Sequence, residues 1–315
     1  FDSESAVRRL ATRLAVSCGR RLDDAQPFCD GHIRRDNGTL LRFHAVLAPT
    51  SQAGTCISLR VLRTASATLD DLVARGSLDH ERAEVLRAVV AARKAFMVVG
   101  GTGSGKTTLL SALLAEVDRH ERIIAIEDTL ELTPDHPHVV NLTSRGANAE
   151  GAGEITIADL VRQSLRMRPD RIVVGECRDA PTMAAAVNAA MAGSALTTTL
   201  HVNNVALTMS RAVSLLPADE RANLVDALGQ SLRLVINQRL VPSTDGKRTA
   251  LREFLVFDAA LRGKLRRADP GDWERLVRAA LDGQGQSYRT AVRKALEAGR
   301  ITERTAAAEL LREEA

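Results

Sequence analysis

A glycine-rich segment that ends in lysine and threonine is the strongest chemical signal in this sequence. Gly100, Gly105, Lys106 and Thr107 have the spacing G-x-x-x-x-G-K-[ST]. In this pattern, small residues let backbone N–H groups surround phosphate oxygens, the lysine adds a positive charge, and the hydroxyl is available to Mg²⁺. We therefore predict a nucleotide phosphate site. Its expected residues are Gly100, Gly101, Thr102, Gly103, Ser104, Gly105, Lys106, Thr107 and Thr108.

Acidic residues follow two apolar runs further along the chain. Glu176 comes after Ile-Val-Val-Gly, while Glu127 and Glu131 come after Arg-Ile-Ile-Ala-Ile. Nucleotide hydrolysis needs one carboxylate for the water shell of the metal and another to orient or deprotonate the attacking water. We assign Glu176 to Mg²⁺ through water, together with Thr107. Of Glu127, Asp128 and Glu131, one is expected to handle the attacking water; Glu131 is favoured because a loop position can reach past the γ-phosphate, and Glu127 is a further catalytic candidate.

His201 ends a threonine-rich run that has the pattern of a strand. It is a candidate for contact with the γ-phosphate, although a lone histidine is more often structural, and both interpretations stay open. Several arginines flank the acidic segments, and an oligomer that reads phosphate across an interface would need one or two of them. They are Arg145, Arg166, Arg168, Arg178 and Arg211.

The surrounding segments alternate between strand and helix patterns. Val98 and Val99 close a buried strand before the glycine-rich segment, and residues 107–116 are rich in helix formers, so the phosphates would meet a helix N-terminus. Such alternation predicts an α/β fold with a mostly parallel sheet and helices on both faces. Ligands in such sheets bind beyond the carboxyl ends of the strands, where the acidic residues fall.

The flanking regions have different patterns. Short apolar runs and turn clusters over residues 20–63 predict a small antiparallel sheet in an N-terminal α+β domain. Capping and periodicity predict helices near residues 68–71 and 79–94. We expect domains at residues 1–70, 71–240 and 241–315. In the tail, we expect helices at residues 221–234, 273–280, 287–298 and 302–311.

Composition narrows the class of protein. The chain has 315 residues with 43 basic and 39 acidic side chains, and the net charge of +4 is spread along the sequence. Aromatic residues make up only 3%, which disfavours a single-strand nucleic-acid binder. No apolar stretch is long enough to span a bilayer, so we expect at most peripheral membrane contact. The four cysteines form no C-x-x-C pair, which fits a reducing cytosol. Because the chain begins at Phe1, we expect a missing N-terminal segment.

Taken together, four segments resemble the type II/type IV secretion ATPase family, most of all the CpaF-type ATPases of tight-adherence (Tad) pilus assembly. They are Gly100-Gly-Thr-Gly-Ser-Gly-Lys-Thr-Thr, Ile124-Ala-Ile-Glu-Asp-Thr-Leu-Glu, the long run from Gly153 to Arg178, and Thr197-Thr-Thr-Leu-His-Val-Asn-Asn. Their order and spacing agree over roughly residues 20–240. The long middle run is far more specific than the phosphate loop.

This resemblance implies an N-terminal α+β domain, a RecA-like P-loop ATPase domain and a helical C-terminal segment, assembled as a homo-hexamer. It assigns Glu127 to Glu131 to the family's Asp box, Glu176 to the Walker B motif and Gly193 to His201 to the His box. It also places Arg60 and Arg63 toward the nucleotide, and Arg168 and Arg178 near subunit contacts. One departure is Ser194, which stands where the His box usually has a first histidine.

The implied function is a cytoplasmic, Mg²⁺-dependent ATP-hydrolysing motor at the inner face of the cytoplasmic membrane. It would drive pilin polymerisation or protein secretion through an inner-membrane platform protein, without binding nucleic acid directly. One alternative is a DNA-linked secretion ATPase of the conjugation type. Another is a nucleotide-binding scaffold without turnover, which Ser194 slightly favours.

Overall fold

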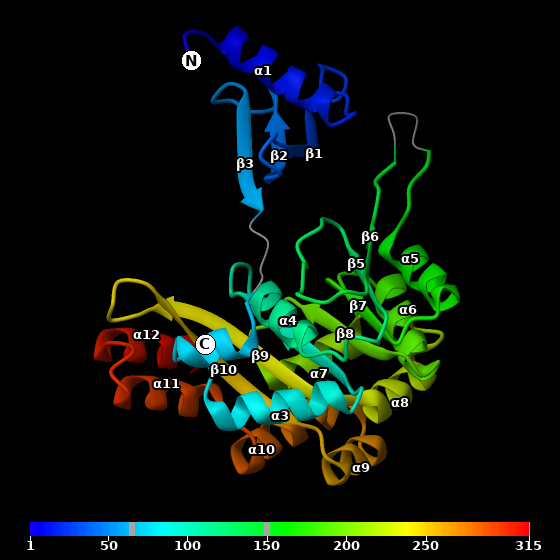
Figure 1. Ribbon diagram of the computed structural model, residues 1–315, viewed down its shortest axis with the longest axis vertical. Helices are drawn as coiled ribbons and strands as arrows, with labels where there is room; N and C mark the ends of the chain where they lie inside the picture. Colours follow the sequence, from blue (N-terminus) through cyan, green and yellow to red (C-terminus); the bar gives the residue numbers. More distant parts are fainter. Residues whose placement is uncertain (63–66, 148–151, 315) are drawn as a thin grey trace. The chain divides into compact units, whose positions relative to one another are not determined.

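The computed structural model describes residues 1–62, 67–147 and 152–314 (Figure 1). Two compact units divide the chain. Phe1–Thr64 and Arg145–Ile155 form the first unit, and Ala65–Ser144 and Thr156–Ala315 form the second. No helix in the described ranges is long and apolar enough to cross a bilayer.

The first unit contains one helix packed on a small antiparallel sheet. Its elements are α1 (Glu4–Ser17), β1 (Phe28–Arg34), β2 (Leu40–Val46) and β3 (Cys56–Leu62), with the sheet order β1-β2-β3. The alternation of β2 turns Phe43 and Ala45 inward, where they are fully buried against Ala11 and Ala15 of α1. The antiparallel sheet predicted for residues 20–63 is confirmed, whereas α1 was not predicted.

The second unit is built on a seven-stranded sheet with the order β10-β9-β4-β8-β7-β5-β6. All pairings are parallel except the antiparallel pair β9 and β10. The strands are β4 (Ala95–Val99), β5 (Ile123–Glu127), β6 (Val139–Thr143), β7 (Arg171–Val174), β8 (Ala195–Leu200), β9 (Leu232–Pro242) and β10 (Arg248–Val256).

Helices cover both faces of this sheet (Figure 1). On one face, α2 (Leu69–Ala74), α3 (His80–Ala91) and α4 (Lys106–Ala115) bury the side chains of Phe96, Val98, Ile123 and Ala125. The other face is covered by α5 (Ile157–Ser164), α6 (Ala180–Met191), α7 (Val205–Ser214), α8 (Arg221–Ser231), α9 (Ala259–Arg267) and α10 (Trp273–Gln284). The short 3-10 helices η1 (Leu165–Met167) and η2 (Pro270–Asp272) precede β7 and α10. The predicted α/β class with a parallel-dominated sheet is confirmed.

The tail differs from its prediction. The expected helix over residues 221–234 ends at Ser231, and the chain continues directly into β9. The expected boundary at residue 240 lies inside β9, and residues 241–315 contain β10 as well as helices. The apolar run Leu234-Val-Ile236 fits either a buried strand or the continuation of a helix, so its pattern does not separate the two.

The last two helices pack against the β10 edge of the sheet. These are α11 (Tyr288–Glu297) and α12 (Glu303–Glu314), and Tyr288, Val292 and Ala295 form a small core with Val241 and Leu251. The expected helices near residues 273–280, 287–298 and 302–311 are therefore present. They extend the second unit and do not form a separate one.

Candidate functional site

The glycine-rich segment connects β4 to α4, as expected. Gly100, Gly103 and Gly105 have φ angles of 144°, 72° and 83°, values that L side chains rarely adopt. A Cβ atom on Gly100 would lie only 2.3 Å from the backbone oxygen of Gln238, so this position has no room for a side chain. These glycines shape the loop so that it ends at the N-terminus of α4, where backbone N–H groups are unpaired and attract anions.

Lys106 lies across the loop. Its ammonium donates to the carbonyl oxygens of Gly100 and Gly101 at 2.8 and 2.9 Å, and burial lowers its pKa. In the same loop, the hydroxyl of Ser104 is buried without a hydrogen-bond partner among the described residues. The loop therefore contains an unsatisfied hydroxyl and a cation held only by carbonyls, and both groups can bind phosphate oxygens.

One of the predicted acids, Glu131, contacts the loop, and a second, Glu127, supports it. The hydroxyl of Thr107 donates to Glu131 Oε2 at 3.3 Å. Glu127, at the end of β5, accepts hydrogen bonds from the backbone N–H groups of Glu131 and Leu132 at 3.2 to 3.4 Å. Burial raises the pKa of Glu127 to about 7, against the effect of these hydrogen bonds. Glu131 thus faces the loop, and Glu127 holds the backbone that carries it.

Glu176 and His201 are brought together beyond the ends of β7 and β8. His201 Nε2 lies 3.0 Å from Glu176 Oε1, and Arg178 donates to Glu176 Oε2 at 2.8 Å. Arg178 also donates to Asp128 at 3.1 Å. Burial raises the pKa of Glu176, but Arg178 and His201 outweigh this effect and hold it below its usual value. Glu176 is therefore an anion when its two basic partners are in place.

Two further arginines predicted from the resemblance, Arg168 and Arg60, lie among the described residues. Arg168 is exposed at the end of η1 with a φ of 53°, and it makes no hydrogen bond or ion pair within the described ranges. Arg60 is exposed on β3 in the first unit. Arg63 lies outside the described residues. Their proposed roles therefore rest on the family resemblance alone.

One residue of the site was missed from the sequence. Gln238 of β9 donates from Nε2 to the carbonyl oxygen of Ser104 at 2.7 Å and accepts from Arg252 Nε at 2.7 Å. The assignment of residues 221–234 to a helix hid β9, and no local motif marks this glutamine. Its role becomes visible only when β9 is paired with β4, which brings it beside the loop.

A parallel sheet with a phosphate loop after β4 and acids at the ends of β5 and β7 defines the class of RecA-like P-loop ATPases. Within that class, the chain belongs to the type II/IV secretion system protein family, whose profile matches residues 2–250. The predicted secretion ATPase family is thereby confirmed, while the tight-adherence type stays a prediction.

Known proteins agree with this assignment. A putative conjugal transfer protein of Mycobacterium tuberculosis is 49% identical over 243 residues, which are 75% of this chain and 68% of that protein. The ATPase DotB of Legionella pneumophila has a TM-score of 0.73 at 30% identity, covering 97% of this chain and 80% of DotB. The pilus retraction motor PilT with bound ADP has a TM-score of 0.72 at 26% identity, covering 90% of this chain and 77% of PilT.

Proposed function

We propose that this chain is an ATP-hydrolysing motor subunit of a pilus-assembly or protein-secretion machine, of the tight-adherence type. The observation that carries the proposal is the meeting of the phosphate loop with Glu131 through Thr107, beside the Glu176–His201 pair. Family membership supports ATP as the substrate, because DotB and PilT are both named as ATPases or motors of this kind.

The first step is the binding of nucleotide phosphates to the loop. In this step Lys106 exchanges the carbonyls of Gly100 and Gly101 for phosphate oxygens. The α4 N-terminus and the loop N–H groups add partial positive charge. Because burial already disfavours the charged lysine, an anionic partner would be stabilising at this position.

Magnesium fits the donor atoms that are present. Thr107 offers a hydroxyl, and Glu176 offers a carboxylate to the water shell of the ion, both oxygen groups of the type that Mg²⁺ prefers. No cluster of three or more His, Cys, Asp or Glu side chains forms a complete metal site in residues 1–62, 67–147 and 152–314. When bound, the metal would neutralise phosphate charge.

In hydrolysis, the acids divide the work. Glu131, next to Thr107, orients or deprotonates the attacking water. Glu127 holds the Glu131 backbone and is a candidate proton acceptor, since its pKa of about 7 lies near neutral pH. Glu176 would hold the water shell of the metal. His201 and Arg178 fix the position of the Glu176 carboxylate.

Assembly and location are further parts of the proposal. A homo-hexamer at the cytoplasmic face of the inner membrane would couple hydrolysis to movement against a platform protein. Arg60, Arg63 and Arg168 would then act toward the nucleotide or across subunit contacts. Arg178 is engaged with Glu176 within its own chain, which supports a role in the site in addition to a contact role.

Single substitutions test the assignment through phosphate release and nucleotide binding. We expect Lys106→Ala to abolish binding and turnover, and Glu131→Gln to abolish turnover while binding is retained. Asp135→Asn is the matched control, because Asp135 is an exposed acid in the same segment. Undiminished hydrolysis in both active-site variants would refute the assignment, and a wild-type chain that binds ATP without turnover would indicate a scaffold.

A second candidate function is a DNA-linked motor of conjugation. It is favoured by the name of the mycobacterial relative, a putative conjugal transfer protein. The scarcity of aromatic side chains weighs against direct contact with single strands. Stimulation of ATP hydrolysis by DNA, falling steeply as salt rises, would favour this function.

A further inference from the structure

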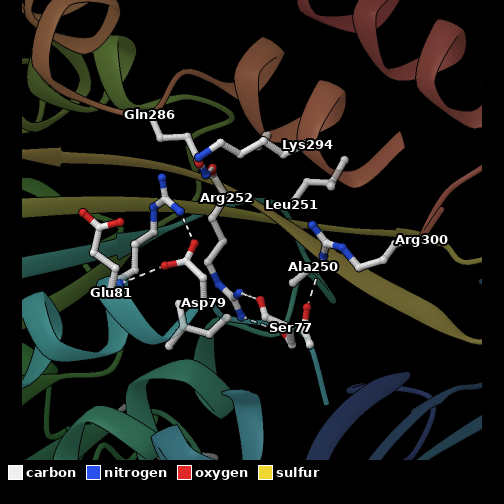
Figure 2. Close-up of a pocket in the computed structure, with 13 residues that line it drawn as sticks. Ser77, Asp79, Glu81, Ala250, Leu251, Arg252, Gln286, Lys294 and Arg300 are labelled. Atoms are coloured by element: carbon white, nitrogen blue, oxygen red, sulfur yellow. Dashed lines mark hydrogen bonds and ion pairs between the residues drawn. The ribbon is translucent and has the colours of Figure 1, made fainter. Parts of the chain in front are cut away.

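A polar cavity lies in the same unit as the phosphate loop. It has a volume of about 480 Å³ and lies between the connection from α2 to α3, the strand β10 and the helix α11 (Figure 2). None of residues 100–108 lines it. The cavity is therefore a separate feature of the second unit, and its lining has to be explained on its own terms.

The central side chain of this cavity is a buried arginine without an acidic hydrogen-bond partner. Arg252 is 7% exposed, and its guanidinium donates to Gln238 Oε1 at 2.7 Å, to Ser77 Oγ at 3.2 Å and to the Ser77 carbonyl. All three acceptors are neutral. Burial, aided by the charge of Arg300 and only partly opposed by that of Asp79, lowers the pKa of Arg252 to about 10. A buried charge whose hydrogen-bond partners are all neutral is costly, so an anion beside it would be stabilising.

The other basic groups of the lining are also short of acidic partners. Arg300 donates to the Gly76 carbonyl at 3.3 Å and to Thr249 Oγ1 at 3.2 Å. Lys294 of α11 makes no hydrogen bond or ion pair within the described part of the chain. Figure 2 shows both side chains at the cavity together with Arg252 and Gln286.

The charge balance of the lining is positive. Its basic groups are Arg82, Arg252, Lys294 and Arg300, and its acids are Asp79 and Glu81. Asp79 is already engaged by the Arg82 side chain and by the N–H group of Arg82 at the start of α3. The excess of basic groups therefore matches an anion that carries two negative charges.

The wall also contains an unmet polar atom. Gln286 is 8% exposed, and its Nε2 donates to the Arg252 carbonyl at 2.8 Å, which fixes the orientation of the amide. Its Oε1 is buried without a partner among the described residues. Buried polar groups are nearly always paired in native proteins, and this oxygen can only accept, so its partner in a filled cavity would be a donor such as the P–OH of a monoprotonated phosphate.

We propose that this cavity binds a phosphate group, as inorganic phosphate or as the phosphate of a small monoester, separately from the nucleotide held by residues 100–108. Guanidinium groups are the side chains best suited to phosphate because they donate paired hydrogen bonds. Arg252 is also hydrogen-bonded to Gln238, which holds the Ser104 carbonyl. The second site is therefore connected to the phosphate loop by two consecutive side-chain hydrogen bonds.

Binding of radiolabelled inorganic phosphate tests the proposal directly. The full chain is first saturated with a non-hydrolysable ATP analogue, so that the phosphate loop and its γ-phosphate position are filled. Equilibrium dialysis is then expected to show one further phosphate per chain. No bound phosphate under these conditions would overturn the proposal.

Matched variants locate the binding site. Arg300→Gln and Lys294→Gln each remove one charge from the lining, and we expect each to weaken phosphate binding by about tenfold, as for the loss of one charge-assisted hydrogen bond. Arg293→Gln is the control, because Arg293 is the neighbouring residue on α11 and lies outside the lining. Equal weakening in the control, or none in the two lining variants, would contradict the assignment.

Competition distinguishes the two sources of phosphate. Glycerol phosphate that displaces the label as well as unlabelled phosphate identifies a monoester site. Glycerol phosphate that fails to displace it identifies inorganic phosphate as the ligand. Because the analogue stays bound throughout, failure of this second site leaves the ATPase assignment unaffected.

Discussion

At the scale of single residues, the acids of the candidate site differ in their surroundings. Glu127 is buried and has a pKa near neutrality, whereas Glu176 is kept ionised by Arg178 and His201. Pairs of carboxylates with opposite pKa shifts are typical of sites where one group exchanges protons and another stays charged. This contrast supports separate roles for the two acids.

The raised pKa of Glu127 predicts a pH-dependent stability. Between pH 4.5 and about 7, the folded chain keeps a proton on Glu127 that the unfolded chain has lost, so the contribution of this group to stability falls as pH rises. The full penalty above pH 7 is about 3 kcal/mol. Glu127→Gln removes this titrating group. The melting temperature of the variant, relative to that of the wild type, should therefore rise as the pH increases from 5 to 8. Parallel pH profiles for the two chains would contradict the prediction.

The residues of the phosphate loop could be predicted from the sequence because their chemistry is local. Glycines, lysine and threonine at fixed spacing form the site within one turn of chain. Glu131, which the sequence favours because it follows a strand, accepts a hydrogen bond from Thr107, and its role toward the attacking water stays a prediction. Gln238 could not be found in this way, since its partners Ser104 and Arg252 are distant in sequence.

At the scale of elements, the loop between β4 and α4 depends on space as much as on charge. A methyl group at Gly100 would meet the Gln238 backbone at 2.3 Å, whereas one at Gly101 would come no closer than 3.9 Å to Asn203. We expect Gly100→Ala to destabilise the fold by about 2 kcal/mol or more through backbone strain and contact. Gly101→Ala should stay within about 1 kcal/mol. Urea unfolding of both variants measures the difference, and equal losses would show that the close approach is relieved by movement of β9.

The contact between β9 and the loop gives a second prediction at this scale. Gln238→Glu keeps an acceptor for Arg252 but removes the donor to the Ser104 carbonyl. Losing one buried hydrogen bond there should weaken nucleotide binding by about tenfold, since an unpaired group costs about 1–3 kcal/mol. Fluorescent ADP titration measures this, with the exposed Gln284→Glu as control. Unchanged affinity would show that the loop does not need this anchor.

The elements themselves were predicted unevenly. The helix α2, with its Thr68–Asp71 capping box, could be predicted because such a box is a local signal, whereas the single caps Ser3, Asn204 and Asp258 did not reveal α1, α7 and α9. β6, β9 and β10 were missed. β9 and β10 are stabilised by pairing with each other and with β4, and that pairing is a tertiary interaction which a short apolar run does not reveal.

At the scale of the whole molecule, each unit has its own apolar core. The core of the first unit involves α1 and its sheet, while those of the second unit lie on the two faces of the large sheet and beside α11. The segment Arg145–Ile155 belongs to the first unit, although the chain before it and after it belongs to the second. This long-range assignment is another feature that the linear division at residues 70 and 240 did not anticipate.

Separate cores predict that the second unit folds without residues 1–66. The contacts of Thr107 with Glu131, of Gln238 with Ser104 and of His201 with Glu176 all lie within that unit. We expect the shortened chain to melt within about 4 °C of the corresponding transition of the full chain, a difference of ~1 kcal/mol. Its turnover should fall if Arg60 acts on the nucleotide. Calorimetry and phosphate release measure these effects, and an unfolded shortened chain would show that the units depend on each other.

The strand β9 has a consequence for how such a motor responds to load. Gln238 holds the phosphate loop, and the next residue, Arg239, pairs with Glu309 of α12 at 2.9 Å and lies over the ring of Tyr288 of α11. Two adjacent residues of β9 thus contact the phosphate loop and the C-terminal helices, respectively. A mechanical load on α11 and α12 would be transmitted to the phosphate loop through the peptide unit that joins Gln238 to Arg239. The turnover rate of the motor would therefore depend on the load.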